Sequence, residues 1–125
     1  MEKVLVLNVK EQTFKEVELP KDFRGFYPLL DCGTFDIVNR RVGGKRFDVY
    51  CDDEGILKTG NPVSAIIKDE DGLKPMLFGN LVFTRTNRDG ETIGISDNDI
   101  EAIKAHSRKV RNLIGQEMLV VGMDW

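Results

Sequence analysis

Apolar residues near the N-terminus recur with the spacing of β-strands. The run Val4 to Val9 is long enough for one buried strand. Phe14, Val17 and Leu19 then predict a second strand, which returns after the polar turn at Glu11 and Gln12. We therefore expect an N-terminal hairpin.

The spacing changes to that of a helix after Pro20, which ends the second strand. Apolar side chains then recur three and four residues apart, at Phe23, Phe26, Leu29 and Leu30. This predicts a short helix near residues 22–31. Gly33 can take the left-handed conformation that closes a helix, so we expect the helix to end at residues 31–33.

The middle of the chain predicts a second hairpin. Apolar stretches at 35–38 and 47–50 flank Gly43 and Gly44, and adjacent glycines accept the positive φ angles of a tight turn. Further strands are expected at 63–67, 76–78, 81–84 and 118–121.

The last fifth of the chain predicts a long amphipathic helix near residues 97–114. Ser96 and Asp99 have the spacing of a capping pair at its start, and Gly115 marks its end. One apolar stripe would pack on the sheet, formed by Ile100, Ile103, Val110, Leu113 and Ile114. The prediction is an α+β fold with a mainly antiparallel sheet. Because no linker or repeat interrupts the chain, residues 1–125 are expected to form one domain.

The composition restricts the kinds of partner that the chain could bind, but it does not indicate a reaction. The 125 residues are 41% hydrophobic, and 21 acidic against 18 basic residues give a net charge of −3. That balance argues against disorder and against binding of a polyanion by the whole surface, so an electrostatic partner needs a local patch. The run Val4 to Val9 is too short for a signal peptide or a membrane span, which makes the cytoplasm the expected location and excludes a membrane partner.

The two cysteines, Cys32 and Cys51, form no CxxC motif and have no histidine cluster nearby. We expect interior thiols there, with neither a zinc site nor a disulfide. The acidic runs at 52–54 and 69–71 consist of consecutive carboxylates, whereas calcium loops alternate them, so solvated turns are the expectation. No metal or cofactor is predicted.

Two basic clusters are the candidate binding residues. The first surrounds the central glycine turn and comprises Arg40, Arg41, Lys45 and Arg46. Four such charges could hold phosphates or an acidic protein surface, or could merely keep an exposed turn soluble. The second lies on one flank of the predicted long helix and comprises Lys104, Arg108 and Arg111. Basic residues near a helix end also complement the helix dipole, so this cluster has a structural explanation as well.

His106 is the only histidine. It could act as a general base beside a nucleophile or a carboxylate, or could be a half-packed residue at the edge of the apolar stripe. None of the sequence motifs of nucleophilic, metal-dependent or nucleotide-hydrolysing enzymes accompanies it.

Several segments carry a resemblance to a known family. They are Asp31 to Ile37, Tyr50 to Gly55, Gly60-Asn61-Pro62 with Ala65, Asp69 to Gly72, Phe78 to Phe83, and Ile95-Ser96-Asp97. Together they resemble the domain-of-unknown-function 3846 family, which is found in phages, plasmids and related mobile elements. The resemblance implies a fold and a mobile-element context, but no activity.

Three hypotheses of function follow. The first is a non-enzymatic accessory protein of a phage or mobile element, which binds a host or phage protein such as a defence component. The second is a nucleic-acid or nucleotide binding module that uses the two basic clusters. The third is a small enzyme centred on His106. The sequence leaves the oligomeric state open, since the apolar strand near 118–121 could join its own sheet or that of a neighbour.

Overall fold

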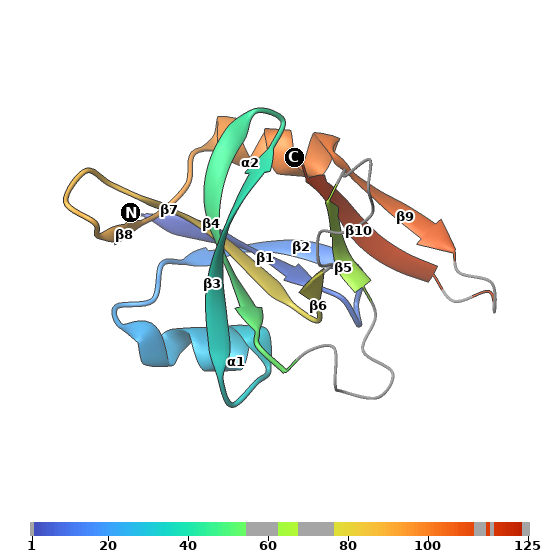
Figure 1. Ribbon diagram of the computed structural model, residues 1–125, viewed down its shortest axis with the longest axis horizontal. Helices are drawn as coiled ribbons and strands as arrows, with labels where there is room; N and C mark the ends of the chain where they lie inside the picture. The colour runs from blue at the N-terminus through green and yellow to red at the C-terminus, as the bar shows by residue number, and fades with distance from the viewer. Residues whose placement is uncertain (1, 55–62, 68–76, 112–114, 116, 124–125) are drawn as a thin grey trace.

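A computed structural model describes residues 2–54, 63–67, 77–111, 115 and 117–123. Within them the chain forms two sheets and two short helical segments (Figure 1). The predicted features at Leu113, Ile114 and 69–71 lie outside the described residues. No helix in the described part is long and apolar enough to cross a membrane.

The larger sheet, sheet A, contains both predicted hairpins. Its strands are β1 (Lys3–Asn8), β2 (Thr13–Glu18), β3 (Phe35–Val42), β4 (Lys45–Asp52), β7 (Leu81–Thr86) and β8 (Thr92–Ile93). The order is β2-β1-β7-β4-β3, with β8 paired to β7, and every pairing is antiparallel. The N-terminal and central hairpins are therefore confirmed. Gly43 and Gly44 form the central turn with φ angles of 59° and 81°.

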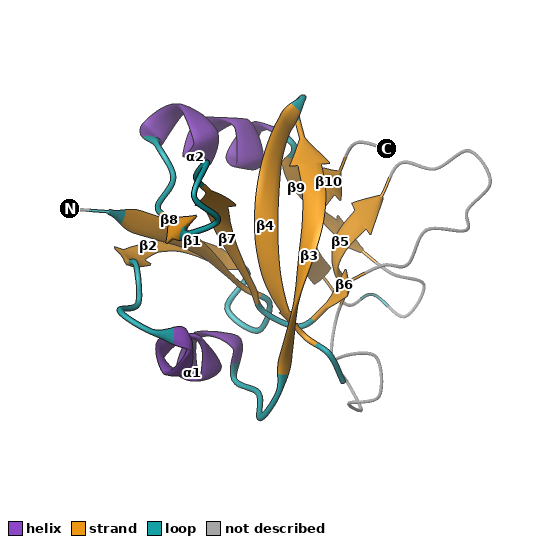
Figure 2. Cartoon of the chain, turned by 60° about the vertical axis from the view of Figure 1, so that its left-hand side comes forward, coloured by secondary structure: helices purple, strands orange, loops and turns teal. Residues whose placement is uncertain are grey.

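Sheet B is smaller and lies beside sheet A (Figure 2). It contains β5 (Val63–Ile67), β6 (Leu77–Phe78), β9 (Ser107–Arg111) and β10 (Glu117–Met123), in the order β6-β5-β10-β9. β10 pairs in parallel with β5 and antiparallel with β9, so this apolar strand completes a sheet of its own chain. The mainly antiparallel α+β prediction is confirmed.

The two faces of sheet A are covered by different elements. One face packs against the helix α2 (Asp97–Ala105) and sheet B, in a core cluster that includes Leu5, Phe83, Ile103 and Val121. The other face packs against α1 (Phe26–Leu30), which follows the 3₁₀ turn η1 (Phe23–Gly25). Because both faces of sheet A are covered, β1 is buried from Val4 to Leu7, and its apolar residues do not alternate with polar ones.

The predicted short helix is confirmed, with two differences. Phe26 stacks on Tyr50 of sheet A with ring centroids 3.9 Å apart, but Phe23, which lies in η1, stays 57% exposed. The left-handed residue that ends α1 is Asp31, with a φ of 52°, and not Gly33. Aspartate tolerates that conformation better than most side chains.

The long helix expected over 97–114 is wrong. The capping box of Ser96 and Asp99 is present as predicted, but α2 ends at Ala105. His106 donates its backbone N–H to Ala102, and the Ser107 hydroxyl donates to the carbonyl of Lys104, so side chain and backbone close the helix. Residues 107–111 become β9 because β10 is a buried strand whose backbone groups need partners on both edges. This tertiary requirement outweighs the helical spacing.

Candidate functional site

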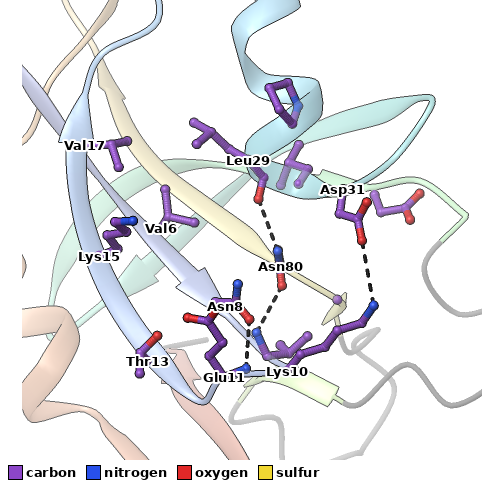
Figure 3. A pocket seen from close by; sticks show the side chains of 15 residues that line it. Val6, Asn8, Lys10, Glu11, Thr13, Lys15, Val17, Leu29, Asp31 and Asn80 are labelled. Atoms are coloured by element: carbon purple, nitrogen blue, oxygen red, sulfur yellow. Dashed lines mark hydrogen bonds and ion pairs between the residues drawn. The ribbon is translucent and has the colours of Figure 1, made fainter.

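A hollow lies between α1 and the N-terminal hairpin, and we call it the α1 groove (Figure 3). Its volume is about 490 Å³, within the usual range for small-molecule pockets. Apolar side chains from both elements line it, namely Val6, Val17, Leu29 and Leu30. The groove exists because α1 is only five residues long and leaves part of this sheet face uncovered.

Asn80 ties the two walls of the groove together. Its side-chain amide donates to the Leu29 carbonyl at the end of α1, over 3.2 Å, and its side-chain oxygen accepts the Val9 N–H at the end of β1, over 3.0 Å (Figure 3). The preceding Gly79 has a φ of 85°, which permits the tight connection from β6 to β7 that presents Asn80. One amide side chain thus sets the spacing between helix and hairpin.

The rim of the groove carries charges of both signs. Lys10 lies 3.8 Å from Asp31, and both side chains are largely exposed, so this pair holds the rim only weakly. Lys15 projects from β2 beside Val6 and Val17 (Figure 3). The arrangement can receive an apolar group at the centre and polar groups at the edge.

Asp52 also lines the groove and is buried. One of its carboxylate oxygens accepts the Glu54 N–H over 2.9 Å, while Asp53 accepts the Thr34 hydroxyl. These contacts hold a turn after β4, but the expectation of a solvated turn at 52–54 is wrong for Asp52, which is buried at the end of that strand. In the described part of the chain, no three His, Cys, Asp or Glu side chains gather as a metal site requires.

The structure splits the predicted cluster at the central hairpin between two faces. Side chains alternate along a strand, and Arg40 and Lys45 share the face of Phe47, which is turned toward α2. Arg41 and Arg46 stand opposite each other on the other face, and both are exposed. The four charges therefore do not form one clamp.

Lys45 belongs to an internal ion network. Asp99 of α2 is only 2% exposed, and it lies 3.3 Å from the Lys45 ammonium and 3.4 Å from the Arg85 guanidinium. Burial alone would raise the pKa of Asp99, but hydrogen bonds from Ser96 and the two nearby cations outweigh it and lower that pKa. This network fastens α2 to β4 and β7.

The second predicted cluster is divided by the end of α2. Lys104 lies in the last turn of the helix, whereas Arg108 and Arg111 lie on β9, and all three side chains are exposed. The expectation that they line one helix flank is wrong, because the helix stops before two of them. β9 is the last described strand of sheet B, and charge on such an edge protects it from unwanted pairing.

The hairpin tip meets the end of α2 at His106. A Cβ atom on Gly43 would lie 2.7 Å from the imidazole Cε1, so the two segments are in close contact. His106 is exposed, and its Nδ1 lies 2.8 Å from the Ala102 carbonyl. Among the described residues, no carboxylate, thiol or hydroxyl is hydrogen-bonded to this imidazole.

Neither cysteine forms a disulfide. Cys51 is buried on β4 as expected, and burial, with a smaller contribution from Asp36, raises its pKa to about 11. Such a thiol stays protonated and unreactive at neutral pH. Cys32 is half-buried.

The family described as a domain of unknown function, DUF3846, matches residues 1–108. The chain belongs to this family. No curated protein matches it, and no solved structure matches it. Three of the segments that carry the resemblance, at Asp31, Asp52 and Gly79-Asn80, line the α1 groove of this DUF3846 protein.

Sequence reasoning missed the groove, although it contained a signal. Gly79-Asn80 was recognisable as a turn, and an asparagine beside a glycine often caps backbone groups. Its two partners, however, lie 51 and 71 residues away in the sequence. Only folding brings them together.

Proposed function

We propose that this DUF3846 protein is a non-enzymatic binding domain that holds a short segment of a partner protein in the α1 groove. The observation that supports it is the groove itself, which combines apolar and polar side chains in its lining with a spacing that Asn80 helps to hold. Peptide-binding domains commonly use grooves of this composition.

The mobile-element context implied by the resemblance suggests the kind of partner. A host protein, such as a component of a defence system, is the partner we propose. Because both signs of charge occur on the rim, at Lys10, Lys15, Glu11 and Asp31, we expect a segment of mixed charge with an apolar side chain at its centre.

A variant that fills the groove tests the proposal. Lys15 is exposed and projects along the groove, so Lys15→Trp would occupy the space without removing a core contact. Lys109→Trp is the matched control, because Lys109 is also an exposed lysine on a strand at a sheet edge and lies outside the groove lining.

A random peptide library would be selected on the wild-type chain alone, and the affinities of the selected peptides would then be measured for both variants. We expect peptides that lose at least about tenfold in affinity with Lys15→Trp, which is about 1.4 kcal/mol, and keep their affinity for Lys109→Trp. Amide NMR shifts on binding should centre on Val6, Val17 and Leu29. The groove would be refuted as the binding site if the selected peptides bound Lys15→Trp and Lys109→Trp equally well. It would also be refuted if the amide NMR shifts occurred outside the groove.

A further inference from the structure

A second surface, distinct from the α1 groove, runs along the outer face of β3. We call it the β3 surface, and its residues are Phe23, Tyr27, Phe35, Ile37, Arg41 and Arg46. Phe35, Ile37 and Arg41 share one face because they are an even number of positions apart. From Phe35 to Arg41 this face extends about 20 Å, at about 3.3 Å per residue.

Aromatic rings occupy one end of the β3 surface. The rings of Tyr27 and Phe35 are 5.1 Å apart, and Phe23 meets Tyr27 edge-on at 6.3 Å. Phe23 is 57% exposed, and the guanidinium of Arg24 lies over its ring at 5.8 Å. Ile37 continues the apolar surface and is 52% exposed, which is unusual for a large apolar side chain in the middle of a strand.

Positive charge occupies the other end. Arg41 and Arg46 are directly opposite in the β3–β4 register, where like charges destabilise a hairpin. Neither forms an ion pair with any described residue. Asp48 lies on the same face, but its oxygens are held by Asn39 and by the Thr86 hydroxyl. The two guanidinium groups are thus available to an anion.

We propose that the β3 surface binds single-stranded nucleic acid, with bases stacked at the aromatic end and phosphates held by Arg41 and Arg46. Stacking on exposed rings together with neighbouring cations is the usual way in which proteins hold single strands without reading sequence. The bases of a duplex could not reach the rings, so single strands are the expected form. The chain is acidic in total, and Glu18, Asp22 and Glu91 share a hollow with Phe23, so the phosphates are expected only at the Arg41 and Arg46 end.

Fluorescence anisotropy with labelled oligo(dT) and oligo(U) of roughly 12 nucleotides tests the proposal, from about 50 mM to about 200 mM salt. We expect the full chain to bind either oligonucleotide, or both, more tightly than a duplex of the same length. Arg41→Gln with Arg46→Gln should weaken binding at least about tenfold at the lowest salt. It should also reduce the slope of log affinity against log salt by about 1.4, because two phosphate contacts are lost.

The charge-matched control is Arg108→Gln with Lys109→Gln on β9, which removes two exposed cations from another part of the surface. It should leave the affinity within about twofold. Phe23→Ala should weaken binding at least about fivefold without changing the salt slope, since stacking contributes about 1 to 3 kcal/mol per base. Circular dichroism of each variant confirms that it is folded.

Three results would overturn the proposal. The first is no binding to either oligonucleotide at the lowest salt. An acidic protein surface would then be the better candidate for the partner of the β3 surface. The second is an equal loss in the Arg41/Arg46 variant and the Arg108/Lys109 control, which would indicate non-specific attraction. The third is an unchanged affinity in Phe23→Ala.

Discussion

Removing the carboxylate of Asp99 tests how α2 is held to the sheet. Asp99 accepts the Ser96 N–H over 3.0 Å in the capping box and faces Lys45 and Arg85. The Asp99→Ala variant loses the cap, which costs about 1 kcal/mol. Each cation contact adds only about 0.5 kcal/mol, because Lys45 and Arg85 are 41% and 45% exposed and can return to water. The expected total is about 2 kcal/mol.

The assay is thermal unfolding followed by circular dichroism. For 125 residues, an unfolding entropy of about 2.1 cal/mol/K per residue makes 1 kcal/mol equivalent to about 4 °C. Asp99→Ala should therefore lower Tm by about 8 °C. Asp99→Asn keeps an oxygen for the Ser96 N–H and loses only the charge, so about half that change is expected. Asp89→Asn, in an exposed turn, is the control and should change the stability by less than about 0.5 kcal/mol.

The same variants predict a pH dependence. The pKa of Asp99 in the folded state lies below the ordinary value of 3.8, so its charge stabilises the fold above about pH 4. This contribution is lost as the pH falls through the lowered pKa. The difference in stability between wild type and Asp99→Asn should be largest near neutral pH and should shrink in acid. A difference that matches that of Asp89→Asn, or that stays constant down to about pH 2, would refute the network.

Two further predictions concern the hairpin turn and the buried thiol. Gly43→Ala should destabilise the chain by about 1 kcal/mol more than Gly44→Ala, because both positions have positive φ but only Gly43 touches His106, and His106→Ala should remove that excess. Chemical denaturation of Gly43→Ala, Gly44→Ala, His106→Ala and the double variant Gly43→Ala with His106→Ala checks this, and equal costs for the two glycines would contradict it. Cys51 should resist a thiol reagent at about pH 8 until the protein unfolds, whereas rapid labelling of native Cys51, read by mass spectrometry against Cys32, would contradict its burial.

The sequence by itself determined the elements whose signals are local. The glycine pair at 43–44, the Ser96–Asp99 capping box and the apolar runs of the N-terminal hairpin each depend on residues within a few positions of one another. Local sterics and hydrogen bonding suffice for them, so these predictions held. The same is true of the short helix near 22–31.

Only the tertiary structure decided β9, the partition of the arginines and the α1 groove. Residues 107–111 have the spacing of a helix, yet the unpaired edge of β10 makes them a strand. The face to which Arg41 turns depends on which side of sheet A is covered, and the groove depends on Asn80 joining Val9 to Leu29. Each outcome arises from groups distant in the sequence, whose contacts exist only once the sheets have packed.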